Sequence, residues 1–500
     1  MIFAIVDDDI EWIRFWIVSR AHRINGGKII NNEYDNPKPK RGKSNIQHPA
    51  PNTQNSNNLR ITNIERFVLN VPFREQCAFW NGLLVQQYRV VEIVRVTTNS
   101  SQIIGYGETL PHYTWQKVSD NSIEKATGKN PFELLGDDSL GAGLQMAIYD
   151  ICGKAMEVPL YRLLNLPKVR DWCPIAWWNT KMPPELLAKE AQTAMENGYL
   201  AHKIKARPWF DIVEQVEAIS AVTPEYYKID IDWNDMLLNV GSASPVLQKL
   251  DQYPRVNLYE GVIPQRDVEG YRQLRKKTNR PILLHFGLPA FLTTIRKEMC
   301  DGYVVTGGIS EVLREGILAA AFEKPFFLQL AGSGMTTAMM AHLGAVLPFA
   351  QHPAVSGMNN YADNLLKEPL KIQDGLVRVP ENPGLGVEFN ESVLEKYRME
   401  PPYKIPYPRV ILSLKRLGGR TTYYAGMTRG TNEELAPYSH LQFAAGDFRL
   451  EGSGIWEDYL AGNQPVYERG VRLEVWEDDG SKEWKELFER ASKAPVHSLR

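Results

Sequence analysis

Four short apolar segments, each ending in a titratable residue, recur at nearly equal spacing in the middle of the chain. They end at Lys205, Asp232, Glu260 and His285, which lie 27, 28 and 25 positions apart. Each segment is followed by a helix-like amphipathic run, and this regular spacing is typical of successive β-strand/α-helix units. Because functional groups of a parallel barrel lie at the C-terminal ends of its strands, we expect these four side chains to meet at one mouth.

The alternation of side chains within two of these segments bears on what they do. Residues i and i+2 of a strand share a face, so Lys203 and Lys205 point the same way, as do Asp230 and Asp232. Charges inside a barrel are costly unless they are paired or bound to a metal. Lysine–carboxylate ion pairs, or strand ends that reach water, are one interpretation. The recurrence of the charges on four consecutive repeats favours the other, a functional site.

Length and composition limit the class of protein. The 500 residues exceed the roughly 250 of an α/β barrel, so additional domains are expected. The formal net charge of −2 gives no reason to expect a nucleic-acid or membrane partner. The sequence contains no apolar run of about 18 residues, so no membrane-spanning helix is predicted. The four cysteines are far apart and lack metal-ligand spacing. We interpret them as reduced, buried thiols, which favours a cytoplasmic protein.

The pattern before the barrel predicts a leader and a small domain. Residues 1–58 are expected to be disordered, because their second half is rich in Asn, Pro, Lys, Gln and Ser and offers little to bury. Residues 59–165 are expected to form an α+β domain, in which strand-like segments precede a strongly helical stretch over 141–164. The segment 73–87 within this domain is predicted to be a loop.

A barrel is predicted over residues 166–368. Further strand-like stretches complete its eight strands, at residues 172–176, 302–305, 326–330 and 354–358. After residues 369–400 comes a final segment, 401–500, with several short strand candidates, one of them at 441–444, and a helical stretch over 481–494. We predict an α+β extension there and assign it no chemistry.

Four motifs resemble the enolase superfamily, in its mandelate racemase/muconate lactonizing branch. Residues 105–109 (GYGET) are similar to a loop of the capping domain, and residues 146–154 (MAIYDICGK) to the helix that joins cap and barrel. Residues 203–205 (KIK) lie where the branch has its Lys-x-Lys motif, and residues 383–387 (PGLGV) resemble the segment that returns to the cap. The resemblance covers residues 59–400. It implies an α/β fold, a TIM-like (β/α)7β barrel with an α+β capping domain.

The resemblance also implies an activity. The family abstracts the proton next to a carboxylate and stabilises the enediolate with Mg²⁺. The protein is thus expected to be a lyase or isomerase, with an acid-sugar dehydratase as one candidate. Lys205 would be the base and Lys203 its modulator, because a second cation and a metal both disfavour the charged form of a lysine. Asp232 and Glu260 match the first two metal ligands.

His285 stands at the third metal position, where the family has an acidic residue. Mg²⁺ prefers oxygen ligands, whereas imidazole suits Zn²⁺, Mn²⁺ or Fe²⁺ better. Three outcomes stay open: Mg²⁺ binds as the resemblance implies, Mn²⁺ or Zn²⁺ replaces it, or no metal binds. A satisfied interior histidine is an equal alternative for His285.

Other residues bear on the substrate. Phe79 and Trp80 lie in the segment that contacts substrate in relatives, and Trp178, Asn234 and Gln329 are further candidates for substrate binding. Gln329 stands where the racemase subgroup has histidine, and the sixth strand lacks the second lysine of another subgroup, so a one-base reaction is expected. The predicted partners are a small carboxylate and further copies of the chain in a homo-oligomer. The alternative function is that of a binding or structural protein that has lost catalysis.

Overall fold

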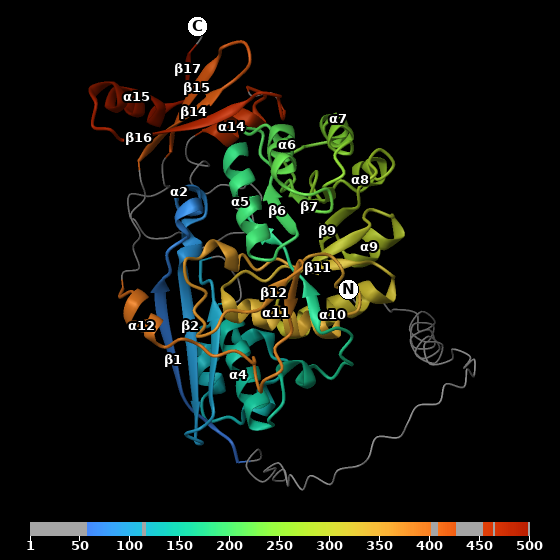
Figure 1. The fold of residues 1–500 in the computed structure, drawn as a ribbon, viewed down its shortest axis with the longest axis vertical. Helices are drawn as coiled ribbons and strands as arrows, with labels where there is room; N and C mark the ends of the chain where they lie inside the picture. The colour runs from blue at the N-terminus through green and yellow to red at the C-terminus, as the bar shows by residue number, and fades with distance from the viewer. Residues whose placement is uncertain (1–57, 113–116, 402–408, 427–453, 464–465, 499–500) are drawn as a thin grey trace, which may run out of the picture. The chain divides into compact units, whose positions relative to one another are not determined.

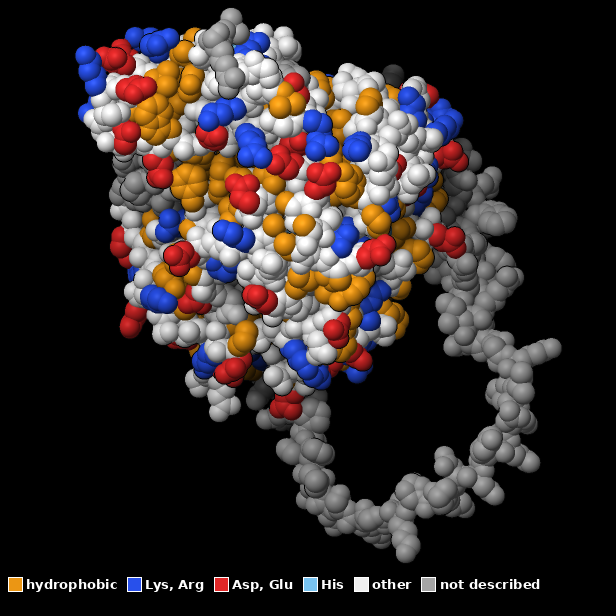
Figure 2. Space-filling model, turned by 45° about the horizontal axis from the view of Figure 1, so that its top comes forward, with side chains coloured by type: hydrophobic (Ala, Val, Ile, Leu, Met, Phe, Trp, Pro, Cys, Tyr) orange, Lys and Arg blue, Asp and Glu red, His pale blue; other side chains and the backbone are white. Residues whose placement is uncertain are grey.

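The computed structural model describes residues 58–112, 117–401, 409–426, 454–463 and 466–498. Apart from its last residue, the predicted leader lies outside these ranges, as does the strand predicted at 441–444. Among the described residues, no helix is long and apolar enough to cross a membrane. On the face seen in Figure 2, positive and negative side chains are interspersed, as a net charge of −2 allows.

The first sheet is antiparallel and has the order β1-β2-β3, formed by β1 (Ile61–Asn70), β2 (Val90–Thr98) and β3 (Ile104–Thr109). Helix α4 (Ala142–Ala155) packs against it, and short α3 (Asp120–Ala126) precedes α4. Close approach of β3 and α4 needs glycine, because a Cβ at Gly107 would lie 2.0 Å from the carbonyl oxygen of Gly143.

The prediction of a loop between β1 and β2 is wrong for the central part of that segment. It contains helix α2 (Glu75–Leu84), which buries Cys77, Trp80 and Leu83. Those residues recur every three positions, which is a helical spacing that the flanking polar residues obscure. The helix presents this apolar side to the core shared with the second sheet.

The second sheet has seven parallel strands in the order β5-β6-β7-β8-β9-β10-β11 and is curled (Figure 1). Its strands are β5 (Trp177–Trp178), β6 (Ala201–Lys205), β7 (Lys228–Asp232), β8 (Val256–Glu260), β9 (Ile282–His285), β10 (Gly302–Val305) and β11 (Phe326–Leu328). The helices that alternate with them are α5 (Pro184–Glu196), α6 (Ile212–Val222), α7 (Val240–Leu250), α8 (Val268–Leu274), α9 (Phe291–Arg296), α10 (Ile309–Ala321) and α11 (Gly334–Val346).

The first and last predicted barrel strands differ from expectation. Strand β4 (Trp172–Pro174) pairs antiparallel with β13 (Leu376–Arg378), in a small sheet that also holds β12 (Ile372–Gln373), so β5 is the first strand of the parallel sheet. A short apolar run does not specify which strand it pairs with, so the sequence pattern alone led to the wrong sheet for residues 172–174. Residues 354–355 form only isolated parallel bridges, Ile175 with Ala354 and Gln329 with Val355.

The described C-terminal residues form a four-stranded antiparallel sheet of order β16-β14-β15-β17. Its strands are β14 (Val410–Lys415), β15 (Thr421–Gly426), β16 (Arg472–Glu477) and β17 (Val496–Ser498), accompanied by α14 (Ile455–Leu460) and α15 (Lys482–Lys493); α12 (Ser392–Tyr397) precedes the sheet. Helix α15 begins where the Ser481 side chain accepts a hydrogen bond from the Trp484 amide, and it buries Trp484 and Ala491. The helix predicted over 481–494 is therefore present.

Candidate active site

Neighbouring strands of the parallel sheet align the charged residues. In the β6–β7 register Lys203 faces Asp230 and Lys205 faces Asp232, and in the β7–β8 register Asp232 faces Glu260. Lys205, Asp232 and Glu260 are the last residues of their strands, whereas Lys203 and Asp230 are the middle residues of theirs. The sheet thus brings together, toward the C-terminal ends of its strands, groups that are more than 50 positions apart in the chain.

The lysines make direct contact with the carboxylates. The Nζ atom of Lys205 contacts Oδ2 of Asp232, and Nζ of Lys203 contacts Oε2 of Glu260. Nζ of Lys203 also lies 3.6 Å from Oδ2 of Asp232 and donates a hydrogen bond of 2.6 Å to Oε1 of Gln329. The four charged side chains are between 1% and 4% exposed. They form a buried cluster in which each carboxylate is paired with an ammonium group.

Burial sets the protonation tendencies of this cluster. Burial lowers the pKa of Lys205, the charges of Lys203 and Arg207 lower it further, and those of Asp232 and Glu260 oppose the shift. Burial alone would raise the pKa of Asp232, but the charges of Lys205 and Lys203 outweigh it and hold the pKa below its usual range. A neutral amine at Lys205 is therefore easier to reach than on an exposed lysine.

The third predicted metal residue lies at the same edge. Nε2 of His285 is 3.3 Å from Oε1 of Glu260, and its side chain is 22% exposed. The nearby Asp235, which the sequence analysis did not single out, has a pKa raised to about 7, first by burial and then by the charge of Asp232. Asp235 also has a left-handed backbone, with φ of +66°.

The charges at this edge do not suit a divalent metal ion. Lys203 lies between Asp232 and Glu260, where a cation shared by the two carboxylates would have to lie, and Lys205 holds Asp232 from another side. With Arg207 buried nearby, three cationic side chains already accompany Asp232 and Glu260, while burial raises the pKa of the neighbouring Asp230 and Asp235 to about 7. In the part of the chain that is described, no group of three or more His, Cys, Asp and Glu side chains is arranged to hold a metal. The site as it stands does not fit the ion that the resemblance implies.

A cavity borders Lys205. Its lining is Tyr88, Leu110, Trp178, Lys205, Gln329, Ala331, Val355, Ser356, Gly357, Asn360 and Tyr361. Of the residues predicted to bind substrate, Trp178 and Gln329 therefore lie at this cavity. Asn234 instead accepts a hydrogen bond of 2.8 Å from Arg207. Trp80 packs edge-on against Phe210, with ring centroids 5.7 Å apart, and Phe79 is 38% exposed.

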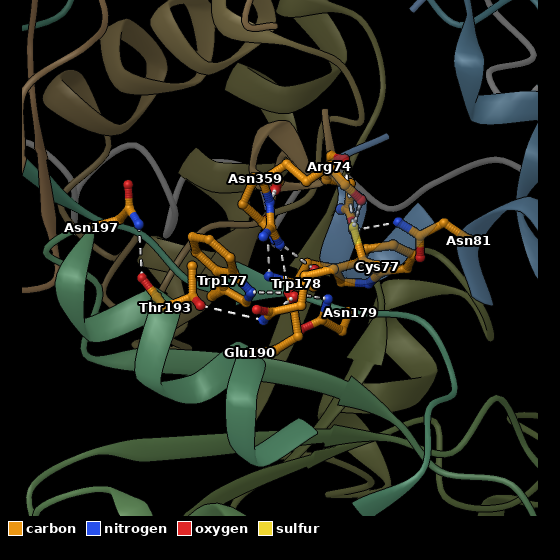
Figure 3. A network of polar contacts seen from close by, with 12 residues as sticks. Arg74, Cys77, Asn81, Trp177, Trp178, Asn179, Glu190, Thr193, Asn197 and Asn359 are labelled. Atoms are coloured by element: carbon orange, nitrogen blue, oxygen red, sulfur yellow. Dashed lines mark hydrogen bonds and ion pairs between the residues drawn. The ribbon is translucent and has the colours of Figure 1, made fainter. Parts of the chain in front are cut away.

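Another buried carboxylate, Glu190 of α5, connects the residue before α2 to strand β5 of the parallel sheet (Figure 3). Oε2 of Glu190 accepts hydrogen bonds from Arg74 at 2.6 Å, Trp177 at 2.9 Å and Asn179 at 2.8 Å. The guanidinium of Arg74 also lies over the Trp177 ring, 4.7 Å from its centroid, and donates to the carbonyl oxygen of Asn359 at 2.5 Å. Arg74 directly precedes α2, so the network fixes the start of that helix against the barrel.

Arg74 and Glu190 of this network, and Tyr88 and Tyr361 of the cavity lining, were not predicted as site residues from the sequence. Tyr88 and Tyr361 come from segments that are distant in the chain, and nothing in the local sequence around either residue indicates that the two line one cavity. A usable signal existed for Glu190 alone. It is an acidic residue between Leu187 and Ala191 on the buried side of a helix, and a buried carboxylate needs partners.

The chain is similar to known enzymes. A family model described as enolase C-terminal domain-like matches residues 186–393. D-gluconate dehydratase from Thermoproteus tenax is 26% identical over 355 residues, covering 62% of this chain and 70% of that protein. Arabinonate dehydratase from Saccharolobus solfataricus is 25% identical over 304 residues, covering 58% and 79%. N-succinyl-L-Arg/Lys racemase from Bacillus cereus is 23% identical over 373 residues, covering 68% and 98%.

Solved structures agree in fold. The 2-chloromuconate cycloisomerase from Rhodococcus opacus superposes with a TM-score of 0.56 at 20% identity, covering 68% of this chain and 99% of that one. A dipeptide epimerase from Cytophaga hutchinsonii, complexed with Mg and a dipeptide, has a TM-score of 0.55 at 19% identity, covering 68% and 98%. These neighbours imply a TIM-like barrel with a capping domain. Over residues 186–393 the chain is therefore similar to the enolase C-terminal domain-like family, and the relatives it resembles include dehydratases and a racemase.

Proposed function

We propose that this protein is an enzyme that removes the proton next to a carboxylate, with Lys205 as the base, and that it acts as a lyase or isomerase. The observation that carries the proposal is the place of Lys205. Its side chain is buried among charges that lower its pKa, and it borders the cavity. A base must be neutral to accept a proton and must reach the substrate, and the lowered pKa of Lys205 and its place at the cavity support this role.

The balance of charge supports an anionic substrate. Lys203, Lys205 and Arg207 supply three positive charges when protonated, against the two carboxylates of Asp232 and Glu260. When Lys205 is neutral, the positive charges of Lys203 and Arg207 balance the two carboxylates. When Lys205 accepts the substrate proton, the excess positive charge returns while negative charge develops on the substrate. Fixed positive groups in a buried site stabilise such a developing enediolate. Lys203 modulates the base through its charge.

The cavity supports a hydroxylated acid and a single base. Gln329, Ser356 and Asn360 supply amide and hydroxyl groups for substrate hydroxyls, and Trp178 contributes an apolar wall. A glutamine cannot replace the second base of a racemase. We therefore favour dehydration of an acid sugar, the reaction named for the gluconate and arabinonate dehydratases among the relatives. Phe79 and Trp80 would act from helix α2, and Asn234 from the loop that follows β7.

The finer architecture belongs to the same proposal. The bridges from residues 354–355 to Ile175 and Gln329 support a closed (β/α)7β barrel. We propose a capping domain over 59–165, a barrel over 166–368, a return segment over 369–400 and an extension over 401–500. Homo-oligomerisation is also expected, and light scattering of the purified chain measures it.

The reaction can be tested by hydrogen exchange into candidate substrates. Purified full-length protein is incubated in D₂O with D-gluconate, arabinonate and other sugar acids, and loss of the α-proton signal is followed by NMR. We expect exchange or dehydration of at least one acid, reduced by at least about 10²-fold in Lys205→Ala. Lys249→Ala, which changes an exposed lysine on α7, is the matched control. Activity that survives unchanged in Lys205→Ala would refute the proposed base.

Metal dependence is measured in the same assay. Mg²⁺, Mn²⁺ or Zn²⁺ is added to chelator-treated protein, because Asp232, Glu260 and His285 are the residues that match the metal positions of relatives. No step of the proposed mechanism depends on the ion, since the paired charges do not fit it.

The pairing of both carboxylates with lysines also favours a second function, that of a carboxylate-binding protein without catalysis. Binding of an acid that shows neither exchange nor dehydration, with or without metal, would support this alternative. Isothermal titration calorimetry with the same acids provides the comparison.

A further inference from the structure

The C-terminal extension contacts two loops of the barrel. The first, residues 206–211, follows Lys205 and leads into α6, and the second, residues 233–239, follows Asp232 and leads into α7. Four residues of the extension make the contacts, namely Tyr459, Tyr467, Arg469 and Gly470, and we call them the docking residues. The extension therefore holds the loops that leave the two strands of the proposed base and its carboxylate partner.

In the first loop, Asp211 has two sets of partners. Its Oδ1 atom accepts hydrogen bonds from the backbone amides of Val213 at 3.0 Å and Glu214 at 3.1 Å, and so caps α6. Its Oδ2 atom accepts hydrogen bonds from Nε of Arg469 at 2.8 Å and from the amide of Gly470 at 2.7 Å. The same buried carboxylate thus begins the helix and binds the extension.

In the second loop, an aromatic contact and a hydrogen bond form the connection. The Tyr467 ring packs edge-on against the Trp233 ring, with centroids 5.0 Å apart, and the Tyr459 hydroxyl donates to the carbonyl oxygen of Met236. Leu238 of this loop has φ of +64°, a conformation that costs a non-glycine residue free energy. External contacts help to offset that cost.

Both loops connect directly to the charged cluster. The amide of Asn234 donates to Oδ1 of Asp232 at 2.9 Å, and Oδ1 of Asn234 accepts from Nη2 of Arg207 at 2.8 Å. The amide of Ala206 donates to the carbonyl oxygen of Asp232 at 2.9 Å. Displacement of either loop would therefore reorient Asp232 and, with it, the ammonium group of Lys205.

We propose that the C-terminal extension is a second cap, which positions Lys205 and Asp232 by holding the loops that follow them. Arg469 and Tyr459 are its positioning residues, and neither is assigned a step in the reaction. The catalytic consequence rests on the proposed function, whereas the positioning can be measured without turnover.

Hydrogen–deuterium exchange of the full-length protein, read by mass spectrometry, tests the positioning. Arg469→Ala and Tyr459→Phe are compared with the wild type. Lys415→Ala, which removes an exposed ion pair with Glu474 inside the extension, is the control. We expect peptides that cover residues 206–211 in the first variant, and 233–239 in the second, to exchange about fivefold faster, as expected for the loss of one hydrogen bond. The control should leave both loops unchanged.

A second measurement separates positioning from general stability. Lys205 is acetylated with an amine-reactive reagent at fixed pH, and the exposed Lys249 serves as the internal reference. We expect the labelling rate of Lys205 relative to Lys249 to rise in Arg469→Ala and Tyr459→Phe, and to return toward wild type in Arg469→Lys, which restores a cationic donor to Asp211.

Two results would overturn the proposal. One is faster exchange confined to the extension, with the loops and the labelling of Lys205 unchanged. The other is equal acceleration in β1 and β2, which would indicate global loosening. Because neither measurement uses a substrate, a missing enzymatic activity would overturn the proposed function and leave the second cap in place.

Discussion

Lys203 and Gln329 meet across the interior of the barrel, where Nζ of the lysine donates a 2.6 Å hydrogen bond to Oε1 of the amide. Four strands separate β6, which carries the lysine, from β11, which ends beside the glutamine. A flat sheet would hold these side chains far apart, since neighbouring strands are about 4.8 Å apart. The contact therefore shows that the sheet is strongly curled. It also places the Gln329 amide next to the charged cluster.

The lysine of this pair is expected to tune the base. Lys203→Met removes a positive charge that lowers the pKa of Lys205. The folded pKa of Lys205 should then rise, so activity should require higher pH. We expect the acidic limb of the kcat/KM profile, along which activity rises as Lys205 loses its proton, to shift to higher pH, with a lower rate at neutral pH. An unshifted profile would show that Lys203 does not act through its charge.

The metal preference should respond to charge at the edge of the sheet. His285→Asp adds a carboxylate beside Glu260, and in combination with Lys203→Met the site changes from an excess of positive to an excess of negative charge. We expect the double variant to bind Mg²⁺ more tightly than the wild type, as measured by calorimetry and by a rise in Tm with added MgCl₂. Equal Mg²⁺ affinity in the two proteins would contradict the charge argument.

The Glu190 network should stabilise the contact between cap and barrel. Glu190→Gln leaves Arg74 without its anionic partner, and breaking a buried pair in this way typically costs about 3–5 kcal/mol of unfolding free energy. The control is Asp120→Asn, which removes an exposed partner of Arg66 and should cost less than about 1 kcal/mol. Denaturant unfolding measures both, and equal effects would show that burial does not decide the difference.

Two glycines of the capping domain should respond in opposite directions to alanine. Gly107→Ala would place a methyl group against the backbone of α4 and should destabilise by at least about 1–3 kcal/mol. Gly82→Ala, within α2, meets only a side-chain oxygen at 3.8 Å and should stabilise by about 0.5–1 kcal/mol. Thermal unfolding distinguishes them, and a tolerated Gly107→Ala would contradict the close packing.

Acid should destabilise the fold partly through His342. Burial lowers the pKa of this α11 histidine from 6.5 to about 4, and its Nε2–H donates to the carbonyl oxygen of Leu385 at 3.0 Å. The unfolded chain takes up the proton at higher pH than the folded chain, so stability falls as pH drops from about 6.5 to 4. The loss amounts to about 3 kcal/mol. His342→Gln should flatten that part of the stability–pH curve. An unchanged slope would contradict a contribution of His342 to the acid sensitivity.

The sequence predicted the charged cluster better than its surroundings. Lys205, Asp232 and Glu260 meet as their spacing predicts, because equal repeats and parallel pairing leave few other arrangements. The partners of β4 and the helix α2 were missed, since short apolar runs do not specify what they pack against. Glu190 and Tyr467 were missed as well, because their roles depend on contacts between segments that share no local pattern.

The four buried thiols make site-specific labelling practical. Burial raises the pKa of Cys77 and Cys173 to about 12 and that of Cys300 to about 11, and it also raises that of Cys152. All four cysteines are free and buried. A cysteine introduced on the exposed side of α15 would therefore outcompete the native thiols for a maleimide dye at neutral pH. With a second introduced cysteine on α7, energy transfer between two dyes would report whether the distance between the extension and the barrel changes during a catalytic cycle.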